Sequence, residues 1–155
     1  MRFALLDRIV EVQPGARLRA VKAVSAAEEY LADHFPTFAV LPGVFMLEAM
    51  VEAAAWLVRS SLDFAPSLVL LKEAKNITYK SFVRPGDVLE VDVQTRRLEG
   101  VESEFSGAGT CGGKEVVRGR FVLSHLTAAA RGPGYEDTDR HIVWVMRERF
   151  RALQS

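Results

Sequence analysis

The sequence predicts an α+β domain in which one long helix packs against a largely antiparallel sheet of five or six strands. First, residues 43 to about 60 are apolar on nearly every side, which is typical of a buried helix. Second, several downstream segments alternate apolar and polar residues, which is the pattern of strands with one buried face. Third, Gly100 and Gly112-Gly113 mark turns between consecutive strands. A sheet of this kind can curl around a helix and leave its other face in water.

The N-terminal part of the chain is expected to form two strands, a short helix and a loop. Residues 5–12 and 17–24 have strand composition, and Pro14-Gly15 between them favours a turn that returns the chain antiparallel. Ser25 begins the Ser-x-x-Glu spacing of a capping box, which predicts a short helix there. A loop over residues 33–41 then leads to the long helix.

The long helix is predicted to begin at Pro42-Gly43 and to end near Ser60. Proline suits the first turn of a helix, because its missing N–H would have no intrahelical partner there. The strands that cover this helix are expected at residues 89–94, 103–111 and 117–123, and the segments 68–72 and 77–82 are expected to add one or two more.

The composition changes after the last of these strands. Residues 128–134 are almost all Ala, Gly and Pro, which predicts a linker, and residues 141–153 repeat apolar side chains with a helical period. We therefore divide the chain into a main domain, residues 1–125, and a C-terminal part, residues 126–155, which holds the linker and an amphipathic helix.

The composition also excludes several classes of protein. Of the 155 residues 49% are hydrophobic and 26% charged, as in a globular domain, and the formal net charge is +0, so we expect no nucleic-acid partner. One cysteine, Cys111, cannot form an internal disulfide or a metal site alone, which is typical of a cytoplasmic protein. The longest apolar stretch carries Glu48 and Glu52, so no membrane span is expected.

Two side chains in the middle of the chain suggest proton chemistry. His34 lies in the proline-containing loop, and Glu48 lies in the apolar helix. Imidazole titrates near neutral pH, and an apolar environment favours the neutral form of a carboxyl group, so this pair suits proton removal beside a carbonyl. The residues alone also allow a purely structural role for both side chains. In that alternative, an arginine or a backbone amide satisfies the Glu48 carboxylate, and His34 only packs or hydrogen-bonds within its loop.

Three segments around these residues form a specific motif: His34-Phe35-Pro36, Leu41-Pro42-Gly43-Val44 and Leu47-Glu48-Ala49-Met50. The motif resembles that of the β-hydroxyacyl-acyl-carrier-protein dehydratases of bacterial fatty acid synthesis, including the spacing from histidine to glutamate. The resemblance covers about residues 5–123 and includes Val83-Arg84-Pro85-Gly86-Asp87 in the order that the family has.

The resemblance implies the hotdog fold, in which a sheet wraps a central helix. It implies dehydration of a 3-hydroxyacyl thioester on acyl carrier protein to the trans-2-enoyl thioester, with His34 as the base and Glu48 as the acid. The two residues would come from different subunits, so it also implies a homodimer or a trimer of dimers. No metal or redox cofactor is needed for this reaction.

The resemblance further indicates which residues bind the substrate. The N–H of Gly43, next to Val44 at the start of the helix, would donate to the thioester oxygen, and Phe38 and Glu52 would line the substrate site. Lys80 and Arg84 are candidates for contact with the acidic surface of acyl carrier protein. The alternative for these two basic residues is a solvated strand edge.

Five residues depart from the family pattern, namely Asp33, Thr37, Phe38, Ala39 and Glu52. We expect Thr37 and Phe38 to narrow or redirect the pocket entrance. Glu52 lies one helical turn after Glu48, and a like charge at that spacing raises the pKa of one carboxyl group. Alternatively, Glu52 points elsewhere and pairs with Lys or Arg.

These departures keep two other functions open. The first is hydrolysis of acyl thioesters, against which His34 argues, since that chemistry needs a water-activating carboxylate and not this histidine. The second is a non-catalytic or weakly active acyl-binding subunit that pairs with an active partner.

Overall fold

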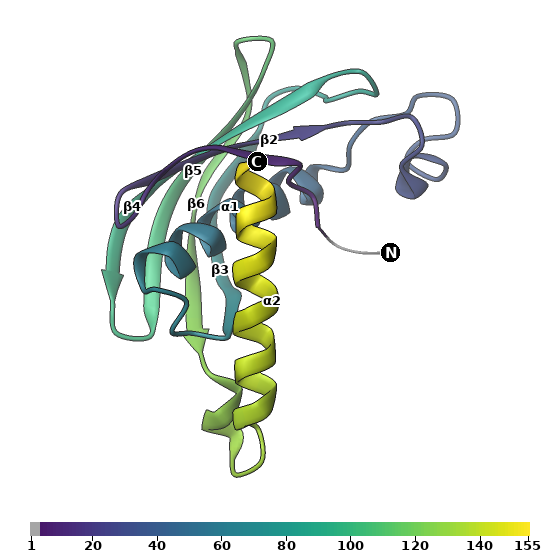
Figure 1. Ribbon diagram of the computed structural model, residues 1–155. Helices are drawn as coiled ribbons and strands as arrows, with labels where there is room; N and C mark the ends of the chain where they lie inside the picture. The colour runs from purple at the N-terminus through teal and green to yellow at the C-terminus, as the bar shows by residue number, and fades with distance from the viewer. Residues whose placement is uncertain (1–3) are drawn as a thin grey trace.

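The structure, a computed structural model, describes residues 4–155 as an antiparallel sheet and two long helices (Figure 1). In chain order the elements are β1 (Arg8–Gln13), β2 (Arg17–Ala23), a 3-10 helix (Glu29–Leu31), α1 (Gly43–Ser61), β3 (Leu68–Tyr79), β4 (Val88–Glu99), β5 (Glu102–Cys111), β6 (Lys114–Leu126), a second 3-10 helix (Ala128–Arg131) and α2 (Glu136–Gln154).

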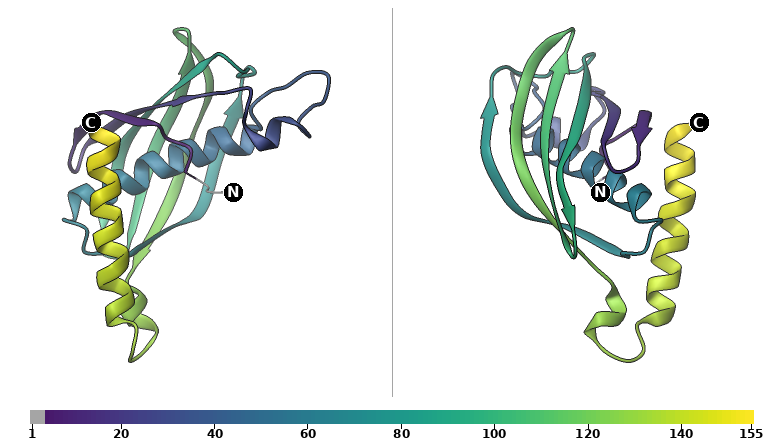
Figure 2. Two further views of the ribbon diagram at one scale, coloured as in Figure 1. Left: turned by 45° about the vertical axis from the view of Figure 1, so that its right-hand side comes forward. Right: turned by 90° about the vertical axis from the view of Figure 1, so that its left-hand side faces the viewer.

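The six strands form one sheet in the order β1-β2-β4-β5-β6-β3, and every neighbouring pair is antiparallel. The sheet curves around α1, and α2 crosses α1 near its C-terminal end on the side away from the sheet (Figure 2). This is the hotdog fold that the sequence predicts, with six strands, and the C-terminal helix adds a third layer to it.

The glycines of β5 allow α1 to approach the sheet closely. A Cβ atom on Gly107 would lie 3.0 Å from Met50 Sδ and 3.1 Å from Phe121 Cε1. Met50 on α1 and Phe121 on β6 are both fully buried. The small residues of β5 therefore determine how deep α1 lies in the sheet, and with it the position of every side chain that α1 carries.

The segments 68–72 and 77–82, which were expected to give one or two strands, form one, because β3 is continuous over Leu68–Tyr79. Its register against β6 shifts between Leu71 and Glu73 and again between Lys75 and Thr78, which interrupts the alternation of apolar residues. The structure corrects one prediction in the N-terminal part: the capping-box helix after Ser25 is wrong, since the 3-10 helix begins only at Glu29.

The capping box fails because its two polar residues have other partners. The Ser25 hydroxyl accepts the N–H of Ala27 at 3.1 Å within a turn. The Glu28 carboxylate pairs with the buried ammonium of Lys22 on β2, at 2.5 Å. An ion pair with a buried lysine outweighs the weak preference of a single glutamate for a helix start.

The C-terminal helix is tied to the rest of the protein at both ends. At its start, Asp139 accepts the N–H groups of Ala128 and Ala129, both at 2.7 Å, and the hydroxyl of Ser67. Near its end, Phe150 contacts the rings of Trp56 and Phe64, with centroid distances of 5.8 and 5.5 Å. The helix also begins earlier than the predicted residue 141, at Glu136, where acidic side chains in the first turn favour a helix start.

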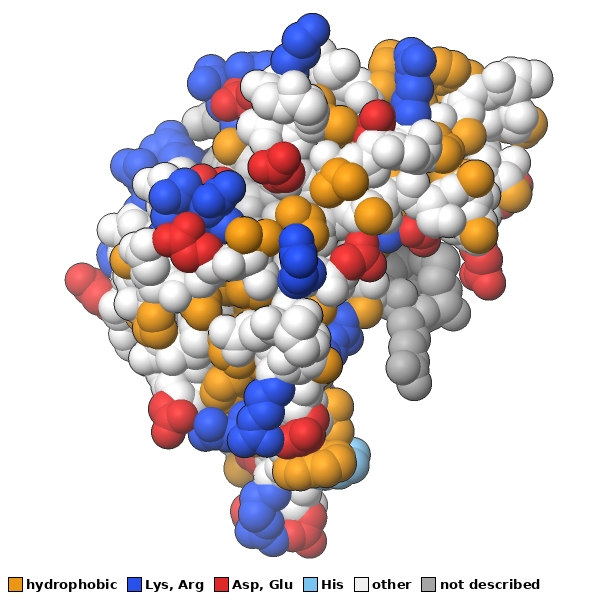
Figure 3. All heavy atoms as spheres, turned by 45° about the horizontal axis from the view of Figure 1, so that its top comes forward, with side chains coloured by type: hydrophobic (Ala, Val, Ile, Leu, Met, Phe, Trp, Pro, Cys, Tyr) orange, Lys and Arg blue, Asp and Glu red, His pale blue; other side chains and the backbone are white. Residues whose placement is uncertain are grey.

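Charges of both signs are mixed on the molecular surface, as the formal net charge of +0 suggests, and Figure 3 shows this on one face. Among residues 4–155, no helix has the length and apolar character needed to cross a membrane.

Candidate active site

His34 is held in its loop by two hydrogen bonds to Val40. The carbonyl oxygen of His34 accepts the Val40 N–H, and the imidazole Nδ1 lies 3.1 Å from the Val40 carbonyl oxygen. Because a carbonyl can only accept, Nδ1 must carry the hydrogen in this bond. In the neutral ring Nε2 then has the free lone pair, so Nε2 is the atom able to take a proton.

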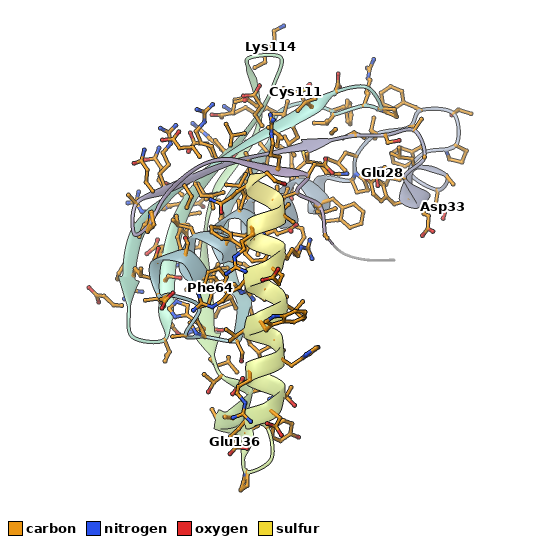
Figure 4. The ribbon with its side chains drawn as sticks, in the orientation of Figure 1. Glu28, Asp33, Phe64, Cys111, Lys114 and Glu136 are labelled. Atoms are coloured by element: carbon orange, nitrogen blue, oxygen red, sulfur yellow. The ribbon has the colours of Figure 1, made fainter. Side chains whose placement is uncertain are left out.

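The loop that carries His34 lies at the opposite end of the molecule from Phe64, which follows α1. Figure 4 shows this separation through the labelled side chains of Asp33 and Phe64. The loop closes on itself, since the N–H groups of Phe35 and Phe38 each bond to the other residue's carbonyl, at 3.2 and 3.1 Å. It therefore presents His34 from a compact turn.

Phe38 and Arg84, which were predicted separately, come together in the structure. The Phe38 ring meets the edge of Phe82 at 5.5 Å, and the Arg84 guanidinium lies 4.9 Å from the centre of the same ring. The N–H of Leu41 also donates to the carbonyl of Val83 at 2.8 Å. The segment 82–84 thus fixes both the tip and the end of the His34 loop.

Lys80 has a different environment from Arg84. Its ammonium group pairs with the carboxylate of Glu115 on β6, and its N–H donates to Val116 at 2.8 Å. Lys80 and Phe82 also line a surface hollow of about 460 Å³. The two basic residues therefore lie on the same part of the surface, but only Arg84 contacts the His34 loop.

The start of α1 offers backbone donors that the helix itself does not use. Helix geometry leaves the N–H groups of Gly43 and Val44 without an intrahelical acceptor, and the N-terminal end of a helix attracts negative charge. The Val44 side chain is 65% exposed, so this end of the helix faces outward.

Tyr79, at the end of β3, packs directly on Gly43. A Cβ atom on Gly43 would lie 3.1 Å from Cε1 of the tyrosine ring, so only glycine allows the ring to come this close. Partial burial raises the pKa of the Tyr79 hydroxyl. The sequence analysis did not find Tyr79, because no local pattern relates the end of a strand to the start of a distant helix.

Glu48 lies one to two turns into α1 and is half-buried. Burial raises the pKa of its carboxyl group, and the negative charge of Glu52 raises it further. Both causes were expected from the sequence. The protonated form of Glu48, which is the form that a general acid needs, is therefore favoured by its surroundings.

Glu52 does form the ion pair that the sequence analysis gave as its alternative role. One carboxylate oxygen accepts the N–H groups of Leu5 and Leu6 at 2.7 and 3.2 Å, and the other accepts from Arg149 of α2 at 3.1 Å. Its carboxylate therefore joins α1 to the N-terminal segment and to α2. Arg149 was not singled out from the sequence either, since its partner lies far away in the chain.

Within one protomer, the described residues show no hydrogen bond or ion pair between His34 and Glu48. Residues 4–155 also contain no group of three or more His, Cys, Asp or Glu side chains arranged to hold a metal ion.

Comparison with known proteins identifies the family of this chain. A family model described as the FabA-like domain matches residues 1–120. The chain belongs to the FabA-like domain family. The 3-hydroxyacyl-acyl-carrier-protein dehydratase FabZ of Myxococcus xanthus is 36% identical over 124 residues, which are 79% of this chain and 81% of that protein. The FabZ of Chloroflexus aggregans is 43% identical over 96 residues, 62% of this chain and 67% of that protein.

Solved structures support the fold of this FabA-like domain. The dehydratase heterocomplex ApeI:P from Xenorhabdus doucetiae matches with a TM-score of 0.67 at 20% identity, over 82% of this chain and 86% of that one. A hypothetical thioesterase with coenzyme A from Streptococcus pneumoniae matches with a TM-score of 0.59 at 11% identity, over 77% and 85%. At these identities the likeness concerns the fold alone.

The match to the FabA-like family ends within β6. The second 3-10 helix, α2 and Arg149 all lie after residue 120. Glu52 thus connects a helix inside the matched region to a helix outside it.

Proposed function

We propose that this protein is a 3-hydroxyacyl-acyl-carrier-protein dehydratase that acts in fatty acid or specialised lipid synthesis, with His34 as base and Glu48 as acid. The observation that carries the proposal is Glu48. A carboxyl group whose pKa is raised by burial lies on α1, near the exposed amide end of that helix. The similarity to FabZ dehydratases over most of the chain supports the same reaction.

The reaction removes one proton and one hydroxyl group from neighbouring carbons of the acyl chain. His34 Nε2 takes the proton from the α-carbon, and the electron pair of that C–H bond forms the double bond to the β-carbon. The C–O bond of the β-carbon breaks, and Glu48 gives its proton to the departing hydroxyl, which leaves as water. His34 is then positively charged and Glu48 negatively charged, and proton exchange with solvent resets both.

The amide end of α1 stabilises the charge that develops on the thioester. As the α-carbon loses its proton, negative charge moves to the carbonyl oxygen, and the N–H groups of Gly43 and Val44 donate to it. Tyr79 packs on Gly43 at this end of the helix, and Phe38 lies in the loop that precedes the helix, so both residues are candidates to bound the space for the acyl chain. Phe38, which departs from the family pattern, therefore affects which acyl chains enter.

A second copy of the chain supplies the other half of each site. Among the described residues β3 pairs only with β6, so a strand of 12 residues leaves its outer edge unpaired. Leu70, Leu71 and Tyr79 on this strand are exposed by 40 to 49%. An unpaired apolar edge of this length favours pairing with another chain. Since Tyr79 contacts Gly43, a partner on this edge lies beside the start of α1, where His34 of one subunit faces Glu48 of the other.

Acyl carrier protein, which delivers the substrate, docks on the surface that holds Arg84 and Lys80. Arg84 is the stronger candidate of the two, because it contacts Phe38 in the His34 loop, whereas Lys80 is already paired with Glu115.

The test is turnover of His34→Ala and Glu48→Gln, each with a matched control. A 3-hydroxybutyryl thioester serves as substrate, and formation of the enoyl product is followed by its absorbance. The controls are His141→Ala on the surface of α2 and Glu90→Gln on the exposed side of β4. We expect both site variants to lose at least ~100-fold in kcat, since each removes a general acid or base, and both controls to keep wild-type rates.

Wild-type turnover in either site variant would refute the proposed dehydratase. If the wild-type protein shows no turnover of 3-hydroxyacyl thioesters of several chain lengths yet binds them, a non-catalytic acyl-binding subunit replaces the proposal.

A further inference from the structure

An ion pair joins α2 to α1, in addition to the packing of Phe150 on Trp56. Arg149 Nη2 lies 3.1 Å from Glu52 Oε1, and the Glu52 side chain is only 12% exposed. Because Glu52 comes one helical turn after Glu48, this ion pair lies next to the residue that we propose as the acid.

The Glu52 carboxylate accepts hydrogen bonds from three N–H donors. The N–H groups of Leu5 and Leu6 and the guanidinium of Arg149 all point at its two oxygens. Three N–H donors therefore hold this carboxylate. The negative charge of Glu52 raises the pKa of Glu48, and Arg149 partly compensates that charge.

Arg59 is a further charged group beside this ion pair. On α1 itself, Arg59 lies with its guanidinium 5.4 Å from the centre of the Trp56 ring, on which Arg149 also lies at 5.9 Å. The pKa of Arg59 is lowered to about 10, first by burial and second by the positive charge of Arg149, while the negative charge of Glu52 acts in the opposite direction.

Two charged residues on other elements packed around α1 have partners away from Glu52. In the N-terminal segment, Asp7 accepts the N–H of Ala23, and on β2 the buried Lys22 pairs with Glu28. In the described part of the chain, Glu52 interacts electrostatically with Glu48, Arg59 and Arg149.

We propose that Arg149 is a positioning residue through which α2 tunes the acid, because it holds and compensates the Glu52 carboxylate one helical turn from Glu48. This inference rests on the proposed function, in which Glu48 donates the proton. It assigns a role to a helix that lies outside the family match, and to the one glutamate that departs from the family pattern beside the acid.

The proposal predicts shifts of opposite sign for its two partners. Glu52→Gln removes the negative charge, so Glu48 loses its proton more easily and titrates at lower pH. Arg149→Gln leaves the Glu52 carboxylate bound to the Leu5 and Leu6 amides but uncompensated, so Glu48 titrates at higher pH. We expect shifts of about half a pH unit, which changes the ratio of ionised to protonated Glu48 about 3-fold at a fixed pH.

The experiment is a carbon-13 NMR titration of the glutamate carboxyl groups in the full-length protein, with the Glu48 signal assigned from its absence in Glu48→Gln. This readout does not depend on turnover. The alkaline limb of the dehydration pH profile is measured in parallel, since the rate falls as Glu48 loses its proton. Arg149→Lys, which keeps the charge, should restore most of the wild-type titration.

Two neighbouring arginines on α2 supply matched controls. Arg151 is exposed and pairs only with Glu148, and Arg147 binds Asp63 at 3.1 Å without contact to Glu52. Neither Arg151→Gln nor Arg147→Gln should move the titration of Glu48. If Arg147→Gln shifts it as much as Arg149→Gln does, the effect is general loosening of α2 and the proposal is wrong.

The proposal is also overturned if Glu48 titrates identically in all variants, or if Glu52→Gln and Arg149→Gln move it in the same direction. Failure of the proposed function is a separate result, because it would appear as wild-type turnover in Glu48→Gln whatever the titrations show.

Discussion

Replacing Gly107 by alanine adds a methyl group at the closest approach of β5 to α1. The new Cβ would lie 3.0 Å from Met50 Sδ, 3.1 Å from Phe121 Cε1 and 3.4 Å from Val93 Cγ1. All three distances are below the ~3.5–4.0 Å of a relaxed contact, and all three partners are buried. Overpacking of a core costs about 1–3 kcal/mol, and a gain of about 0.4–1 kcal/mol from the stiffer unfolded chain offsets part of it. We therefore expect Gly107→Ala to lower the free energy of unfolding by about 1–2 kcal/mol.

A second substitution tests whether the cost comes from this contact. Met50→Ala alone should destabilise by about 2–5 kcal/mol, because it leaves a cavity. The double variant should cost less than the sum of the two by about 1 kcal/mol, because the new methyl group occupies part of that cavity. Urea unfolding at one fixed protein concentration measures all three, with Ala108→Val on the outer face of β5 as the control, expected within about 0.5 kcal/mol of wild type. Additive costs, or a stabilised Gly107→Ala, would show that β5 does not limit the depth of α1.

Three further predictions concern the site and α2. Gly43→Val should reduce kcat at least ~10-fold with little change in thermal stability. The added side chain meets the Tyr79 ring and displaces the N–H at the helix start, and an unchanged kcat would exclude this N–H as the donor to the thioester oxygen. Phe150→Ala should lower the free energy of unfolding by about 2–3 kcal/mol in a urea titration, since it removes the main aromatic contact of α2, and a loss below about 0.5 kcal/mol would show that α2 is held by its polar contacts alone. Glu48→Gln should be more stable than wild type at pH 7–8 and lose this advantage below about pH 4, where Glu48 is protonated in the folded and unfolded states alike. The reason is that folding raises the pKa of Glu48, so its ionisation above that pKa destabilises the folded wild type. Thermal melts across pH measure the difference, and a variant that is less stable than wild type at pH 7–8 would contradict the prediction.

The central helix α1 and the strands β4, β5 and β6 could be predicted from local sequence. Pro42-Gly43 marks the start of α1 within one residue, because a proline followed by an apolar run is a strong helix signal. Alternation and glycine turns likewise indicate β4, β5 and β6. The sequence left open whether residues 68–82 form one strand or two, because two register irregularities in β3 disturb the alternation without ending the strand.

The contacts that complete the site depend on tertiary packing and could not be predicted. Glu52 and Arg149 are separated by 97 positions, and their ion pair exists only because α2 packs against the open side of α1. Tyr79 reaches Gly43 because β3 ends beside the helix start. The sequence did predict both possible roles of Glu52, but it contained no information that would choose between them.

The most direct test of the account is complementation between two inactive variants. His34→Ala and Glu48→Gln are co-expressed, so that mixed dimers form. If each site takes His34 from one subunit and Glu48 from the other, a mixed dimer contains one intact site. Half of the dimers are mixed and half of their sites are intact, so activity should recover to about a quarter of the wild-type value. If the mixture remains as inactive as either variant alone, His34 and Glu48 do not meet across a subunit boundary, and the proposed active site is wrong.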